Sequence, residues 1–323
     1  MEYRKLISFG KNSFVVSLPK NWVRQSKLKK GDLIYIEENN QKLILSKGDS
    51  EKGTEERQRV ILIDGKSITL IEREINAAYI ANCRNIILKG VELKSKIKEL
   101  QRAIQNLIAL EIMEQTSDVI YAKDFLNMDK VSIEELIRKM DVIARTMIKE
   151  SSRIFAEDNY ENINDRDRDV NRLYFLLYRA VLYNLEYPMK AFKNFNYMPV
   201  DLLKFHFIGF YIEGIADEVR RTARFARKIS VSAHDKKQLE QFFDKVERYY
   251  TDTMKAIYAK DSELGLKLSE LKKAYLTELE ELERKNMQVP DFIKMLSRQR
   301  RLVSFVHNLG RTVYTLNYLP ATR

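Results

Sequence analysis

The sequence predicts an α+β chain of several domains, with a small β unit at the N-terminus and a long all-helical C-terminal part. Three observations carry this prediction. Short alternating runs fill residues 1–47, strand and helix patterns alternate over 59–130, and helical periodicity without strand signals continues over 131–323. The polar, aperiodic residues 48–58 are predicted to be a linker.

The N-terminal unit is predicted to begin with a strand, a short helix and a turn. Residues 14–18 read as a strand, and Pro19, which cannot continue it, suits the first turn of a helix over 21–24. Gly31, between Lys30 and Asp32, is typical of a turn. Two further strands, joined by a hairpin turn at Asn39-Asn40, are expected at 33–36 and 42–45.

The middle unit is predicted to be a βαβαββ domain, in which a sheet carries helices on a face. Its first helix has an apolar stripe of Ile68, Ile71, Ile75 and Ala78. The expected strands are 60–63, 85–88, 111–114 and 119–121, and the expected helices are 68–80 and 97–110.

The C-terminal part is predicted to contain six helices arranged as a pair of three-helix bundles. Ser132 followed by Glu135 is a capping-box signature at the first helix start. Short connections favour antiparallel neighbours. The expected helices lie near 132–156, 162–193, 199–229, 233–259, 261–285 and 289–317, with Pro188 or 194–199 as alternative breaks after the second.

Positive charge is concentrated at the N-terminus. The chain carries a formal charge of +11, and residues 1–30 hold eight Lys or Arg and one acid. A positive field attracts polyanions such as DNA, RNA or an anionic membrane surface, although it also serves solubility. Cys83 is the only cysteine, which fits a reducing, cytoplasmic compartment, and no apolar run reaches the roughly 18 residues of a membrane span.

The N-terminal residues resemble the AbrB/SpoVT and MazE family of swapped-hairpin DNA-binding domains. Ser13–Trp22 (SFVVSLPKNW) and Leu28–Asp32 (LKKGD) carry the resemblance. It implies an obligate homodimer in which hairpins of two chains interleave into one β-barrel with a basic face toward duplex DNA. The MazE likeness alone suggests an antitoxin, but antitoxins usually follow the hairpin with a short disordered tail, not with two helical bundles, so that role is less expected. The implied DNA contacts are Arg4, Lys5, Lys11, Asn12, Lys20 and Arg24.

The helical part resembles the PhoU family of phosphate-uptake regulators. Arg166–Tyr174 (RDRDVNRLY) and Tyr211–Val219 (YIEGIADEV) carry this resemblance, and Arg73–Tyr79 is similar to the connecting region of two-part AbrB–PhoU proteins of archaea. The family pattern, an acid and then an Asp four residues later on two facing helices, implies a divalent metal or iron site in the first bundle. The candidate ligands are Asp167, Asn171, Glu213 and Asp217.

An ion-pair network is the alternative interpretation of these four residues. Asn171 stands where the family usually has Asp, which removes one charge. Arg220 and Arg221 lie within salt-bridge reach of Asp217, and Arg172 is close to the other pair. In the second bundle only Glu270 keeps an acid at the corresponding positions, so no metal is expected there.

These features favour a cytoplasmic transcriptional regulator of phosphate uptake, in which the helices relay phosphate status. The alternative is an adaptor that acts at a phosphate ABC transporter, with its ATPase subunit as partner and without sequence-specific DNA binding. We expect no enzyme and no nucleotide cofactor, because the sequence has no metal-protease motif and no Gly-rich phosphate loop. Its three His residues are scattered at 206, 234 and 307.

Overall fold

The computed structural model describes residues 3–11, 13–39, 42–47, 56–230, 232–286 and 288–317. The chain divides into two compact units, one ending at Glu56 and one beginning at Arg57. The predicted linker lies largely outside the described residues, as do Asn12 and the second residue of the Asn39-Asn40 turn. The boundaries at 47, 58 and 130 stay predictions.

The N-terminal unit consists of two hairpins and a short helix. In the first hairpin Ile7 pairs with Val15, and Gly10, at φ 72°, opens the turn in the left-handed region that favours glycine. The Gly31 turn forms as predicted, with the Lys29 N–H donating to the Asp32 carboxylate at 2.8 Å. The elements are β1 (Ile7–Phe9), β2 (Ser13–Val15), α1 (Lys20–Gln25), β3 (Ile34–Asn39) and β4 (Lys42–Lys47). Each hairpin forms its own two-stranded sheet, so the dimeric barrel stays a prediction.

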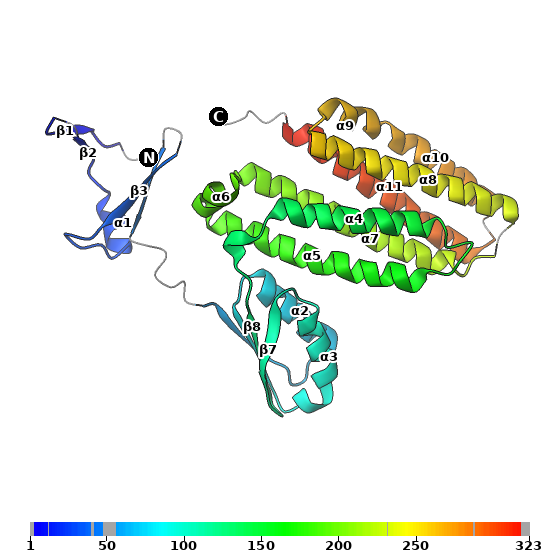
Figure 1. Cartoon of the computed structure of the whole chain (residues 1–323), viewed down its shortest axis with the longest axis horizontal. Coiled ribbons are helices and arrows are strands. Elements are labelled where there is room, and N and C mark those ends of the chain that lie inside the picture. The colour runs from blue at the N-terminus through cyan, green and yellow to red at the C-terminus, as the bar shows by residue number, and fades with distance from the viewer. Residues whose placement is uncertain are drawn as a thin grey trace. The chain divides into compact units, whose positions relative to one another are not determined.

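The middle residues form a four-stranded sheet of order β5-β6-β8-β7 in the predicted βαβαββ sequence. β5 and β6 are parallel and joined through α2, whereas β8 runs antiparallel to both of its neighbours. α2 and α3 cover one face, where Ile86, Leu88 and Ile120 are buried (Figure 1). The elements are β5 (Gln58–Leu62), α2 (Ile68–Ile80), β6 (Asn85–Lys89), α3 (Leu93–Gln105), β7 (Leu110–Gln115) and β8 (Val119–Asp124).

The remaining described residues form a 3₁₀ turn and eight helices, rather than the six predicted. Pro188 separates the second predicted helix into two, because proline has no N–H to donate. The fifth is interrupted at Glu270, where the neighbouring Ser269 hydroxyl donates to the Leu266 carbonyl. The elements are η1 (Met128–Lys130), α4 (Ile133–Ser151), α5 (Tyr160–Glu186), α6 (Pro188–Phe195), α7 (Pro199–Ala226), α8 (Ala233–Ala259), α9 (Ser262–Ser269), α10 (Leu271–Lys285) and α11 (Pro290–Asn317).

The helices share one hydrophobic core. α4, α5 and α7 pack together, as do α8 to α11, and α7 also packs along α11 (Figure 1). The buried side chains on both sides of this contact belong to a single cluster from Met128 to Val313. The two predicted bundles are therefore joined rather than separate. Within the part of the chain described, none of the helices combines the length and hydropathy that crossing a bilayer requires.

Candidate functional site

The predicted DNA-contacting residues are all exposed where the structure describes them. Arg4 and Lys5 precede β1, and Lys11 lies in the first hairpin turn. Lys20 and Arg24 are four residues apart and so share one face of α1. Asn12 lies outside the described residues. The five cations can therefore all reach a polyanion.

Most of the large apolar side chains that the structure describes in the N-terminal unit are exposed. No described side chain between residues 3 and 47 is buried, and the exposed fractions reach 69% for Phe14 and 76% for Leu33. Burying a side chain of this size stabilises a folded protein by about 1.5–3 kcal/mol. A single copy of the unit gains little of this stabilisation, because these side chains stay in contact with water. The large exposed apolar residues are Tyr3, Leu6, Ile7, Phe9, Phe14, Val15, Val16, Leu33, Ile36 and Leu43. Such a unit needs a second surface to cover it.

The four predicted metal ligands come together between α5 and α7. Asp167, which is buried, lies 2.9 Å from Nε of Arg220, and another nitrogen of the same guanidinium lies 2.6 Å from Asp217. Arg221 also pairs with Asp217 at 2.6 Å. Asn171 donates its amide N–H to Asp167 at 3.3 Å. The i, i+4 spacing on each helix brings these side chains together, and Arg220 and Arg221 pair with the two aspartates.

Glu213 is the exception within this cluster. Among the described residues no hydrogen bond or ion pair reaches its carboxylate. Burial, followed by the nearby Asp217 and Asp167 carboxylates, raises the pKa of Glu213 to about 7. Burial also raises the pKa of Asp167. Glu213 therefore changes charge near neutral pH.

The arrangement of these side chains fits an ion-pair network better than a metal site. Arg220 bridges Asp167 and Asp217, so a cation would have to displace a guanidinium from both carboxylates. Nowhere in the described residues do three or more His, Cys, Asp or Glu side chains gather in a way that could hold a metal ion. The metal site stays a prediction. Metal analysis of protein purified without chelator, compared with the double variant Glu213→Ala plus Asp217→Ala, tests it.

A second charged cluster lies beside the first and was missed in the sequence. Glu218 is 1% exposed, and its carboxylate lies 2.9 Å from Arg221 of α7 and 3.3 Å from Arg301 of α11. Arg298 of α11 approaches the same carboxylate at 3.8 Å. The sequence does contain a sign of this cluster. Glu218 is an acid three residues after Ile215, and so it lies on the same, apolar face of α7. Glu218 thereby draws Arg298 and Arg301 of α11 toward α7.

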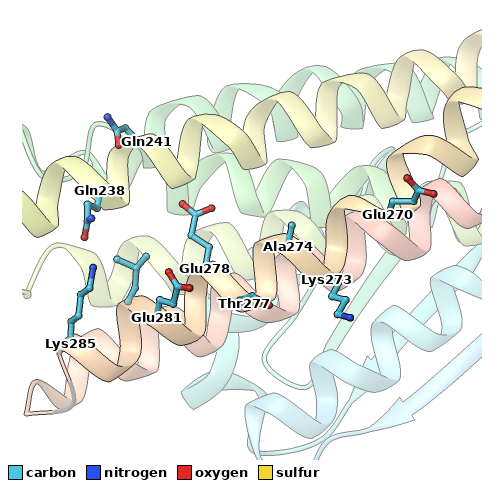
Figure 2. Close-up of a pocket in the computed structure, with 10 residues that line it drawn as sticks. Gln238, Gln241, Glu270, Lys273, Ala274, Thr277, Glu278, Glu281 and Lys285 are labelled. Atoms are coloured by element: carbon cyan, nitrogen blue, oxygen red, sulfur yellow. The ribbon is translucent and has the colours of Figure 1, made fainter.

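A surface groove lies between α8 and α10 and is shown in Figure 2. Glu278 in this groove pairs with Lys245 at 2.8 Å. Glu278 lies between Lys285 at one end and Glu270 at the other (Figure 2). The other polar side chains are Gln238, Gln241, Lys273, Thr277, Glu281 and Lys285. None of these ten lining residues is a His or Cys.

Residues 7–53 match a known family. It is described as antidote-toxin recognition MazE, bacterial antitoxin, and the match confirms the predicted resemblance of the N-terminal residues. No curated protein matches the chain. Among solved structures, the crystal structure of PhoU from Pseudomonas aeruginosa is similar at 14% identity, with a TM-score of 0.48, covering 57% of this chain and 95% of that one.

Replacing Glu213 with glutamine is expected to change the pH dependence of stability. Because the folded-state pKa, about 7, lies above the ordinary value of 4.5, Glu213 favours folding below pH 4.5. That contribution is lost as pH rises through 7. Glu213→Gln is therefore expected to raise the free energy of unfolding at pH 8 by on the order of 1–3 kcal/mol, with little change at pH 4.5.

Urea unfolding at the two pH values measures this effect. The matched control is Asp165→Asn on α5, since the Asp165 side chain is 68% exposed. This control is expected to leave the difference between the two pH values unchanged. Equal stabilisation by Glu213→Gln at both pH values would show that Glu213 does not titrate in this range.

Proposed function

We propose that the protein is a DNA-binding transcriptional regulator that acts as a homodimer through its N-terminal unit. The single observation that carries the proposal is a unit with exposed basic side chains and no buried described residue between 3 and 47. A second copy of the same unit is the simplest partner for its apolar surface. Each copy exposes the same apolar side chains, and each can bury them against the other. The paired units then present twice the positive charge to one duplex.

The phosphate-related part of the proposal has a different basis. It depends on the sequence resemblance of the segments around Asp167 and Glu213 to phosphate-uptake regulators. In this proposal the helical part relays phosphate status to the DNA-binding unit. A regulator acting only at a transporter would bind specific and random DNA equally well. Genome-wide mapping of bound DNA, with phosphate abundant and scarce, distinguishes the two roles.

Binding of the full chain to duplex DNA is expected to weaken steeply with salt. Each phosphate contact contributes a slope of about −0.9 to the plot of log K against log salt concentration. Replacing both Arg4 and Arg24 with alanine is therefore expected to make the slope shallower by about 1.8 per protomer, or about 3.6 for the dimer. Fluorescence anisotropy with a labelled duplex at several salt concentrations measures it.

The matched control is Arg153→Ala plus Lys149→Ala, which removes two positive charges outside the N-terminal unit. It is expected to leave the slope unchanged. An unchanged slope for Arg4→Ala plus Arg24→Ala would place the DNA contacts elsewhere in the chain.

A further inference from the structure

A polar pocket lies where the middle sheet unit meets the helical bundle. It is a cavity of about 320 Å³ lined by three helices, α2, α3 and α5. α5 contributes Arg168, Asn171, Arg172 and Phe175. Their spacing of three, four and seven residues places them on one face of the helix. The lining therefore follows from the register of α5 against the sheet unit.

The polar half of this pocket consists mainly of donors. Arg168 and Arg172 supply two guanidinium groups, and Asn76 of α2 and Asn106 at the end of α3 add side-chain amides. Glu72 is the only acid among the lining residues. Guanidinium groups bind the oxygens of phosphate or carboxylate through two parallel hydrogen bonds. This donor set is suited to an oxyanion.

Arg172 is the best-placed of these donors. Its Nε is buried and has no hydrogen-bond partner, and its closest carboxylate, Asp169, lies 3.9 Å away. Arg168 pairs with Asp165 at 3.0 Å, but both of these side chains are about two-thirds exposed. Exposed pairs of this kind contribute about 0–1 kcal/mol, so an anion in the pocket can compete for the guanidinium.

The other half of the pocket is apolar, because Ala103, Leu107 and Phe175 line it. Its volume is at the lower end of the range of roughly 300–1,000 Å³ typical of small-molecule sites. An inorganic ion would leave this apolar wall uncovered, whereas a small organic group attached to the phosphate would cover it.

We propose that this pocket binds a small phosphate monoester, with Arg168 and Arg172 on the phosphoryl oxygens and the organic part against Phe175. The ligand contacts side chains from both the sheet unit and the bundle. Its binding is therefore expected to stabilise their packing. The proposal is independent of DNA binding, so the failure of one leaves the other standing.

Isothermal titration calorimetry of the full chain tests the proposal, with ribose 5-phosphate, inorganic phosphate and ribose as probes. Ribose 5-phosphate is expected to bind more tightly than inorganic phosphate, and ribose not to bind. Arg172→Gln is expected to raise the dissociation constant about tenfold or more, because a charge-assisted hydrogen-bonding group is lost. Arg172→Lys keeps the charge without the planar donor pair. Its dissociation constant is expected to lie between those of the unaltered chain and Arg172→Gln.

Two further variants make the test specific to the pocket. Asn76→Asp on α2 puts a negative charge opposite the arginines and is expected to weaken binding as Arg172→Gln does. Arg153→Gln removes one exposed arginine outside the pocket and is expected to change nothing. Circular dichroism establishes that each variant is folded.

Three results of these titrations would contradict the proposed site or its ligand. Binding of ribose 5-phosphate that is equal in the unaltered chain and in Arg172→Gln would overturn the site. No binding to the unaltered chain at millimolar concentration would overturn it as well. Binding of inorganic phosphate alone would overturn the monoester as the ligand.

Discussion

Replacing Arg179 with methionine is expected to lower the free energy of unfolding by about 3–5 kcal/mol, the range for removing one partner of a buried ion pair. Arg179 on α5 is 1% exposed and lies 2.6 Å from the carboxylate of Asp124, which is 0% exposed. Its Nε donates to the Asn82 side chain at 2.9 Å, and its guanidinium stacks over Tyr79 at 4.5 Å. The arginine of one helix thus holds three side chains of the sheet unit.

The expected loss of stability arises mainly from the Asp124 carboxylate, which stays buried without its partner. Without Arg179, the nearest cation to Asp124 is Arg84 at 3.7 Å, which is 41% exposed and compensates only in part. Adding Asp124→Asn to Arg179→Met removes the buried charge while leaving an oxygen that can accept the Leu126 N–H bond. The double variant is therefore expected to be more stable than Arg179→Met alone.

A matched exposed pair provides the control for this prediction. Arg57 and Glu186 also join the sheet unit to α5, but their side chains are 48% and 37% exposed. Arg57→Met is expected to lower the free energy of unfolding by only about 0–1 kcal/mol. Urea unfolding followed by circular dichroism compares the variants. A loss for Arg179→Met no larger than for Arg57→Met would contradict the dominant role of the buried pair.

Local patterns were sufficient to predict most elements. The helix predicted over 68–80 has those bounds in the structure, because an apolar stripe continues between a capping Ser67 and a left-handed residue at Asn82. Strong breakers such as Pro188 were visible as well. The interruption at Glu270 was missed, since it depends on a serine side chain that bonds to the backbone rather than on a Gly or Pro.

The charged clusters were predictable only in part. Spacing indicated that Glu213 and Asp217 share one face of α7, and the resemblance to phosphate-uptake regulators implied that this face meets Asp167. Arg220 was among the candidate partners, and it bridges Asp167 and Asp217. Arg172 was also expected to join but instead lies nearest to Asp169. Arg179 sits within an apolar run and Glu218 beside the buried residues Ile215 and Val219 of α7. A single sequence does not show which distant residue neutralises such a charge. The pocket beside Arg172 depends on how α2 and α3 pack against α5, and no local pattern contains that information.

Replacing Phe14 with aspartate is expected to separate the proposed dimer and to abolish DNA binding. Phe14 lies on β2 opposite Ser8, and it is 69% exposed in the single chain. A substitution at such an exposed position normally changes stability by less than about 0.5 kcal/mol. In a dimer that buries both copies, the loss of two aromatic side chains removes about 3 kcal/mol or more, a change of about 100-fold or more in the dimer dissociation constant.

Sedimentation equilibrium of the full chain, together with anisotropy of a labelled duplex, measures both consequences. Val91→Asp is the control, because Val91 is 83% exposed in the connection between β6 and α3, outside the N-terminal unit. It is expected to leave the sedimentation and the DNA affinity unchanged. If Phe14→Asp also changes neither, the apolar surface of the N-terminal unit does not form the dimer. If Phe14→Asp separates the dimer while DNA affinity is retained, one copy of the basic surface is sufficient for binding.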